Sequence, residues 1–386
     1  MPIYQLGGRS GSIFAYADEL DAWLRTLNRK AGAQPRGARV DSLDHPSSAA
    51  IRTGGNNEPL SSASQASATE QANLKVARAV KMWENLSSSD LRAIIRRLRE
   101  AIDLDCENAS AFAWLSQILT ADCILGTADG ASALHTAAAA LAKALETNPG
   151  LAEAQCALGW LQMLHGRNWQ SARRLFEESE GRGPAGASSL IGRALLHIAE
   201  GCLNEASELL LEASSANPLS GFSMALRAWT SFLNHQFETA LTIVHRSRAS
   251  GHSGHLLDSV EALVHTQLPE PAILIERISA LATVSPRHLV ARGALGYVYC
   301  KIGEHEQAKE IYKALAGPEI QGIGHQSYAV ALVLIGLNRH EEAAKRLEQS
   351  YGEGSIWSLG FRSDPVLATL RDDLIFQELM ERIDYP

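Results

Sequence analysis

Apolar residues recur at the spacing of an amphipathic helix in widely separated parts of the chain. Ile95, Leu98 and Ile102 show this spacing early, and Ile375, Leu379 and Ile383, with Leu374 beside them, show it near the C-terminal end. Residues three or four positions apart lie on one helical face. By contrast, PIYQLGGRSGSIFAYA at the start holds two β-prone runs on either side of a Gly/Ser turn. The pattern predicts a helical chain whose only strands lie in residues 2–16.

Between these ends the sequence repeats at intervals of 34 or 35 residues. A 34-residue period is that of the tetratricopeptide repeat (TPR), a pair of antiparallel helices. A small residue is expected where the second helix of each pair crosses the first most closely. The positions that define the period are Ala137, Ala172, Ala206, Ala240, Leu274, Ala308 and Ala343. Pro149, Pro218 and Pro286, twelve residues after three of these positions, end helical pairs because proline cannot continue a helix.

These positions predict an all-α fold, an α–α superhelix (TPR solenoid) with a small N-terminal β-hairpin plus helix. We expect about seven helical pairs between residues 109 and 351, preceded by two capping helices at about 70–86 and 89–104. No single pair can bury its own apolar face, so stability comes from stacking neighbours. The predicted domains are 1–30, a head; 31–68, a flexible linker rich in Gly, Ser, Ala, Pro and Asn; 69–363, the solenoid; and 364–386, a capping helix.

Composition and charge narrow the class of protein. The chain is 46% hydrophobic and 20% charged, which suits a folded protein, and its net charge of −8 argues against a general nucleic-acid binder. Residues 1–40 carry a net charge of +3, which leaves −11 for the rest. Five scattered cysteines form no CxxC pair, and neither a signal peptide nor an apolar run of 18 residues is present. We therefore expect a cytoplasmic protein without a membrane partner.

The head resembles the second half of the helix-turn-helix domain of MerR/excisionase-like bacterial regulators. The resemblance lies in a glycine-rich turn followed by a run like VFAY and ELDAWL, and it implies a wing and the helix after it. In that family the helix-turn-helix precedes this motif, whereas here Met1 stands where it should already have ended. We therefore expect that the chain does not bind DNA sequence-specifically. The residues that carry the resemblance are Pro2, Ile3, Tyr4, Gly7, Gly8, Ile13, Phe14, Ala15, Tyr16, Glu19, Leu20, Asp21, Ala22, Trp23 and Leu24.

The body, about residues 90–386, resembles the TPR module that bacterial regulators carry behind DNA-binding, kinase or nucleotide-cyclase domains. Two segments carry this resemblance: ALETNPGLAEAQCALGWLQMLHGRNWQSARRLFEES, and the C-terminal part of the sequence that begins with EEAAKRLEQS. The output domains of such regulators vary, so no activity is implied for this chain. No kinase or cyclase motif is present.

No motif for chemistry emerges from the sequence. The GxxxxGK[ST] phosphate loop and the GxSxG motif are missing, and His305 and His340 lack the second His of a zincin helix. His252 and His255 have the spacing of metal ligands, but we interpret them as part of a solvated loop. Arg92, Arg96 and Arg99 are interpreted as a solvated helix face. We expect no catalytic, cofactor-binding or metal-binding residue.

Binding is the remaining function. By the resemblance to TPRs, the ninth position of each first helix faces the concave groove, and Trp and Tyr there are efficient anchors. The candidate groove residues are Gln117, Trp160, Trp229 and Tyr297, and the alternative is that they pack between neighbouring first helices. The sequence thus predicts a non-catalytic scaffold that binds a peptide or partner helix in the TPR groove, in bacterial signalling or regulation, with self-association as a further possibility. The alternatives are a transcriptional regulator with a DNA-binding head and TPR sensor, and an accessory subunit of a signalling enzyme.

Overall fold

The structure is a computed structural model of the 386-residue chain. The residues that it describes are 4–5, 13–14, 59–84, 91–125, 130–180, 185–216, 220–269, 271–284, 288–317, 320, 325–383 and 385–386.

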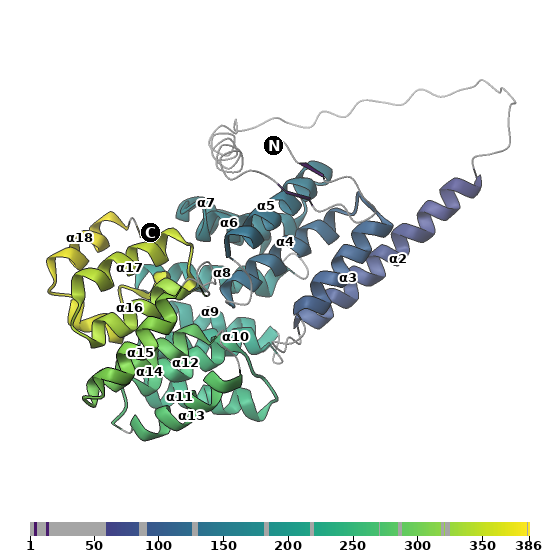
Figure 1. The fold of residues 1–386 in the computed structure, drawn as a ribbon. Helices are drawn as coiled ribbons and strands as arrows, with labels where there is room; N and C mark the ends of the chain where they lie inside the picture. Colours follow the sequence, from purple (N-terminus) through teal and green to yellow (C-terminus); the bar gives the residue numbers. More distant parts are fainter. Residues whose placement is uncertain are drawn as a thin grey trace, which may run out of the picture.

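Seven antiparallel helical pairs form the body of the molecule (Figure 1). The first helices are α4 (Ala109–Ile124), α6 (Ala152–Leu164), α8 (Ala185–Glu200), α10 (Gly221–Leu233), α12 (His255–His265), α14 (Leu289–Lys301) and α16 (Gln326–Gly336). The second helices are α5 (Gly130–Thr147), α7 (Trp169–Ser179), α9 (Leu203–Ala216), α11 (Phe237–Ala249), α13 (Pro271–Val284), α15 (His305–Ala316) and α17 (His340–Gly352). Most successive first helices contact one another, and we call this layer of first helices the inner layer.

The small residues that defined the period lie in the core, as predicted. Their side chains are fully buried because a larger group would hold the two helices of each pair apart. The side chain of Leu274, which filled the gap in the period, is outside the described residues. The buried residues of this set are Ala137, Ala172, Ala206, Ala240, Ala308 and Ala343.

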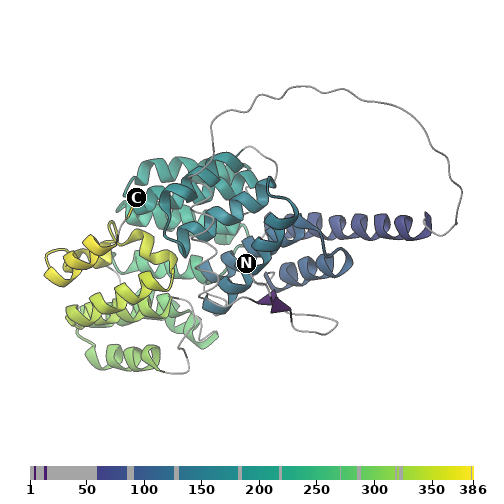
Figure 2. The same ribbon diagram turned by 90° about the horizontal axis from the view of Figure 1, so that it is seen from above.

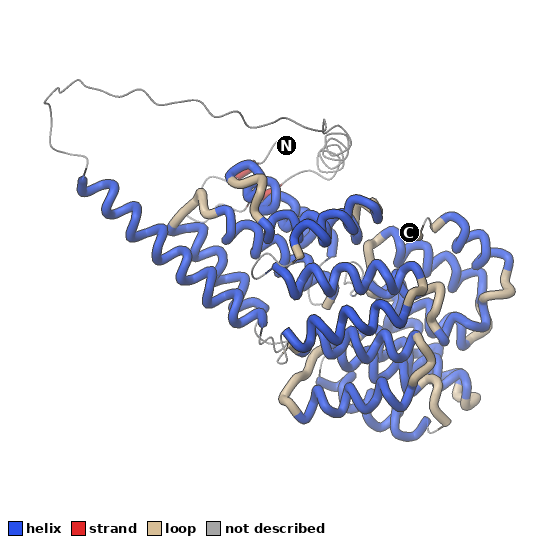
Figure 3. The backbone as a smooth tube through the Cα atoms, turned by 180° about the vertical axis from the view of Figure 1, so that it is seen from behind, coloured by secondary structure: helices blue, strands red, loops and turns tan. Residues whose placement is uncertain are grey.

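Two further helices precede the pairs, α2 (Pro59–Glu84) and α3 (Leu91–Leu104). They form a long antiparallel pair that extends away from the rest of the body (Figure 3). Helix α2 begins at Pro59, so residues 59–68 of the predicted linker are helical. On α3, Ile94 and Leu98 are buried, whereas the predicted arginine face is exposed.

Only a small part of the predicted head falls within the described residues. Strand β1 (Tyr4–Gln5) pairs antiparallel with β2 (Ile13–Phe14), with Tyr4 opposite Phe14. The predicted helix of the head and linker residues 31–58 lie outside the described part of the chain.

The C-terminal end differs from the single capping helix predicted for residues 364–386. Two 3-10 helices, η2 (Ile356–Gly360) and η3 (Pro365–Leu370), precede the short helix α18 (Leu374–Arg382). The break has a local cause, because Asp364 accepts the Val366 N–H and Pro365 opens the next turn. We call residues 355–370 the closing segment.

The closing segment lies against helices from the earlier pairs. It contacts α8 and α16, and in Figures 1 and 2 the yellow C-terminal part of the chain lies beside the teal helices of the middle. The side chains of Trp357, Phe361 and Leu367 are buried in this contact. A residue far along the chain therefore helps to form the core of earlier repeats.

Hydrogen bonds from His325 join three distant points of the chain. Its Nε2 lies 2.9 Å from the carbonyl oxygen of Ile124 at the end of α4, and its Nδ1 lies 3.0 Å from Ser355 Oγ. In addition, the Arg167 guanidinium donates to the Tyr351 carbonyl oxygen and stacks over the Tyr351 ring. The array is thus held in a curve by contacts between its first and last repeats.

An aromatic pocket on the inner layer

The four predicted groove residues occupy equivalent places in their helices. Gln117, Trp160, Trp229 and Tyr297 are each the ninth residue of their first helix, α4, α6, α10 and α14. Their surroundings differ, however. Gln117 and Trp160 line one pocket but are only 5% and 4% exposed, so they also pack between neighbouring helices. Trp229 is covered by the closing segment, and Tyr297 is half-buried near Lys301.

The pocket is a cavity of about 210 Å³ between the end of α2 and the inner-layer helices α4, α6, α8 and α10. Four aromatic side chains from four elements contribute to its lining: Trp83, Trp114, Trp160 and Phe222. The ring of Trp83 lies 5.8 Å from that of Phe222, which brings the end of the capping pair against the fourth repeat. The pocket therefore depends on the curvature of the array, since no single pair supplies its walls.

Polar groups of the lining fix the positions of its walls. Trp160 Nε1 donates to Ser188 Oγ at 3.1 Å, which ties α6 to α8. Gln117 Nε2 donates to the Glu153 carbonyl oxygen at 2.9 Å, which ties α4 to α6. Ser220 caps α10 by accepting the Ser223 N–H. Among the described lining residues, Glu84 is the only one with an ionisable side chain.

Sequence reasoning missed three of the aromatic residues that line the pocket. Trp114 lies one turn before Gln117 on the same face of α4, and Phe222 lies seven residues before Trp229 on α10. Positions three and seven residues away share a helical face, so this spacing was the available signal. Trp83 carried no such signal, because it belongs to the capping pair.

Trp229 is 1% exposed and lies beneath the closing segment. The Trp357 ring meets it edge-on, with centroids 5.3 Å apart and planes at 77°. On its other side, Trp357 stacks on Tyr328 at 5.5 Å and 6°. A β-carbon added at Gly360 would lie 2.9 Å from Trp229 Cζ2, so a glycine is needed for this approach. The chain's own C-terminal segment thus occupies the inner layer at Trp229.

Tyr297 keeps part of its ring exposed. Burial, and next the negative charge of Asp364, raise the pKa of its hydroxyl above the ordinary value. The Lys301 Nζ lies 5.8 Å from the ring centroid. Tyr297 does not share the pocket that Gln117 and Trp160 line.

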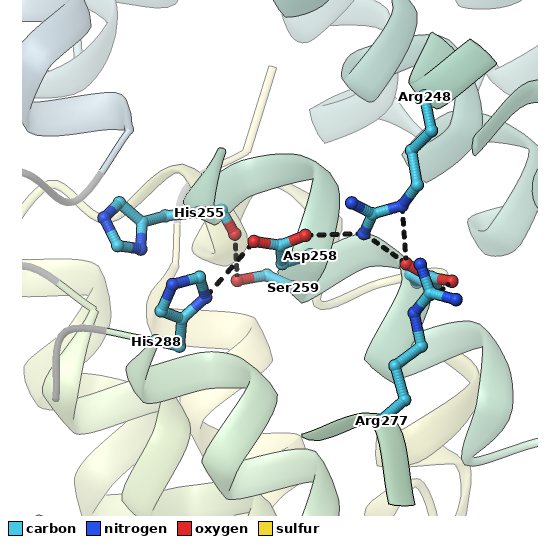
Figure 4. A network of polar contacts seen from close by, with 7 residues as sticks. Arg248, His255, Asp258, Ser259, Arg277 and His288 are labelled. Carbon is cyan, nitrogen blue, oxygen red and sulfur yellow. Dashed lines mark hydrogen bonds and ion pairs between the residues drawn. The ribbon is translucent and has the colours of Figure 1, made fainter. Parts of the chain in front are cut away.

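A network of buried charges lies between α11, α12, α13 and α14 (Figure 4). Arg248 pairs with Asp258 and Glu261, and Arg277 Nε lies 2.9 Å from the second oxygen of Glu261. Burial alone would lower the pKa of Arg248, but its two acidic partners raise it. His288 Nδ1 lies 3.3 Å from Asp258, and burial lowers its pKa. These pairs join four helices and satisfy one another's charge.

The network contains Ser, His and Asp, but not in the arrangement of a nucleophilic site. Ser259 Oγ donates to the His255 carbonyl oxygen at 2.6 Å within its own helix, and Figure 4 shows no contact from it to His288. A nucleophile would need a hydrogen bond to the histidine that takes its proton.

The prediction of a solvated loop at His252 and His255 is wrong. His252 is buried, lies 3.2 Å from Ser247 Oγ through its Nδ1, and packs against Gly221 at the start of α10. The ring of His255 lies 4.2 Å from that of His288. Within this loop Gly251 and Ser253 are exposed, and His252 is buried because its ring packs against the start of α10, a contact that the sequence around it does not reveal.

Among the described residues, one group has the spacing of a metal site. Ligand atoms of His197, Glu200 and Cys202 lie within 4.8 Å of one another at the end of α8. However, Glu200 already pairs with Arg173, whose positive charge opposes a cation there. None of the helices that the structure describes is long and apolar enough to cross a membrane.

Comparison with solved structures identifies the fold. A structure of the APC/C hetero-tetramer Cut9–Hcn1 matches with a TM-score of 0.51 and 15% identity, over 80% of this chain. Yeast Tom70 matches with a TM-score of 0.42 and 12% identity, over 94% of this chain and 76% of that one. The P58(IPK) TPR domain matches with a TM-score of 0.25 and 12% identity, over 81% of this chain and 97% of that one.

The match spans 55% of the Cut9–Hcn1 chain, about half its length. No protein-family model matches this sequence, and no curated protein matches it. The body of the chain has a TPR-like, all-helical fold.

Proposed function

We propose that the protein is a non-catalytic scaffold that binds a segment of a partner protein in the aromatic pocket of the inner layer. The observation that carries the proposal is the pocket itself, in which four aromatic side chains from four elements surround a cavity of about 210 Å³. Protein-binding sites concentrate aromatic residues in this way, because they supply large contact area at low cost in conformational entropy.

The closing segment restricts where a partner can bind. It covers Trp229 and Tyr328, whose side chains are almost fully buried. Trp160 is itself only 4% exposed, so a partner reaches its ring through the pocket that it lines, whereas at Trp229 the closing segment already fills the space. The resemblance of the body to the TPR module of bacterial regulators supports a role in bacterial signalling or regulation. Nothing in the described residues favours the DNA-binding alternative.

Filling the pocket tests the proposal. Ala187, in the first turn of α8, lines the pocket and is partly exposed, so Ala187→Phe occupies the cavity without disturbing the core. Ala249, the last residue of α11, is exposed and outside the pocket, so Ala249→Phe is the matched control. We expect Ala187→Phe to lose at least ~10-fold in the capture of a specific set of proteins, which corresponds to about 1.4 kcal/mol.

The comparison uses quantitative mass spectrometry of proteins cross-linked to each full-length chain. The melting temperatures of the two variants should match that of the wild type. Equal capture by all three chains, at equal melting temperature, would contradict the proposal.

A further inference from the structure

The molecule contains its own example of what binds at the ninth position of an inner-layer helix. Trp160 and Trp229 hold that position in α6 and α10. At Trp229 the position is filled by a tryptophan, Trp357, which a short 3-10 helix presents edge-on. Trp160 meets Phe176 edge-on, with ring centroids 5.8 Å apart, and it also lines the open pocket. The filled site therefore serves as a template for the open one.

The size and lining of the open pocket fit the same kind of side chain. A dry cavity of about 150 Å³ is enough to hold a benzene molecule, and this pocket measures about 210 Å³. Its four aromatic residues can meet an added ring edge-on, as Trp229 meets Trp357, and such pairs contribute about 0.5–1.5 kcal/mol beyond burial. Because Glu84, the only ionisable residue in the described part of the lining, is acidic, an anionic occupant is disfavoured.

We propose that the pocket binds a tryptophan side chain that a partner protein presents on a short turn, in the manner of the chain's own Ile356–Gly360. This inference rests on the proposed function, since it names the chemistry that the scaffold recognises. The pattern expected in the partner is a tryptophan followed within three residues by glycine, as in Trp357 and Gly360, because the glycine lets the turn approach the wall closely.

The test uses the full-length chain and two small probes, N-acetyl-tryptophanamide and N-acetyl-leucinamide, observed by saturation-transfer NMR. We expect the tryptophan probe to bind at least ~10-fold more tightly than the leucine probe. Ala187→Phe should weaken its binding at least ~10-fold, and Ala249→Phe should leave it unchanged. Equal binding of the two probes, or wild-type binding by Ala187→Phe, overturns the inference.

A third variant, Trp23→Ala, distinguishes a tryptophan of a partner protein from one of the chain's own as the occupant of the pocket. Trp23 lies in the amphipathic stretch of the head, and a tryptophan there is a competing occupant. If the probe binds only after Trp23→Ala, the occupant is the chain's own head and the inference is overturned. If the probe fails to bind while protein capture still depends on Ala187, the proposed function stands and the tryptophan inference fails. If the probe binds but Ala187→Phe loses no partner, the pocket accepts tryptophan, but the proposed function fails and the inference that rests on it fails as well.

Discussion

At the scale of single residues, two buried ionisable groups hold the closing segment in place with opposite dependence on pH: His325, which bonds to its Ser355, and Asp364, which belongs to it. Burial lowers the pKa of His325 to about 4 and raises the pKa of Asp364 to about 6. Neutral His325 is the form that bonds to Ile124 and Ser355, whereas Asp364 accepts the Tyr328 hydroxyl and the Val366 N–H. Their contributions to stability should therefore largely offset each other in the wild type.

Replacing His325 should reveal its contribution. In the unfolded chain this histidine takes up a proton near pH 6.5, and in the folded chain only near pH 4. Its contribution to the free energy of unfolding is therefore complete above pH 6.5 and declines as the pH falls to 4. We expect the free energy of unfolding of the wild type, relative to His325→Gln, to fall by about 3 kcal/mol over that range. Urea unfolding of both proteins at several pH values measures it.

Asp364→Asn should give the opposite slope. The unfolded carboxyl group loses its proton near pH 3.8 and the folded one near pH 6, so the wild type gains stability relative to the variant as the pH falls from 6 to 3.8. The same urea titrations should show a relative gain of about 3 kcal/mol. Parallel pH profiles for wild type and variant would mean that Asp364 is not desolvated in the native state.

At the scale of helices, close crossing is set by residues without bulk. A β-carbon at Gly293 would lie 2.4 Å from the carbonyl oxygen of Ala329, so α14 and α16 approach through their backbones. By contrast, a β-carbon added at Gly352, at the end of α17, would have no such neighbouring atom within 4 Å. The two glycines therefore differ in what they do, although both are helical.

Substituting each glycine by alanine should separate packing from helix propensity. We expect Gly293→Ala to destabilise the protein by about 1–3 kcal/mol, because the backbones must move apart. Gly352→Ala should be neutral or stabilise by up to about 1 kcal/mol, because alanine restricts the unfolded chain. Thermal unfolding of the two variants checks both values. Equal losses would show that α14 and α16 do not cross as closely as described.

The helical pairs could be predicted because they repeat. Ala137 to Ala343 mark a local pattern with a fixed period, and each marks a crossing within one pair. The contact of Trp357 with Trp229 has no period, because it joins residues 128 positions apart only after the array has curved. For the same reason the sequence placed Trp229 in a groove but could not show that the chain itself occupies that groove. The burial of His252 was missed because its contact is with Gly221, at the far end of the preceding helical pair.

At the scale of the whole molecule, the closing segment changes how stability is shared. An open solenoid is stabilised mainly by contacts between neighbouring repeats. Here His325 bonds to Ile124, and Arg167 bonds to the carbonyl oxygen of Tyr351. The first and last repeats therefore stabilise each other directly, and a change at one end should be felt at the other.

Trp357→Ala should make this coupling measurable. Removing a buried tryptophan costs about 3–5 kcal/mol, and the side chain is 1% exposed. Because the closing segment also carries Ser355, the partner of His325, we expect faster amide hydrogen exchange at the C-terminal end of α4 as well as in α10. Faster exchange confined to α10 and the last repeat would contradict the coupling. Leu374→Ala, at an exposed residue of α18, is the control.

The late position of the closing segment has a consequence for synthesis of the protein. Repeat pairs can stack as they leave the ribosome, because each contacts mainly its neighbours. The aromatic surface of Trp229 and Tyr328, however, stays uncovered until residues 355–370 have been translated. A chain ended by a premature stop codon just after α17 would contain all seven pairs and still expose this surface. Chaperones and proteases, which bind exposed apolar side chains, would then distinguish a chain that contains the closing segment from one that lacks it.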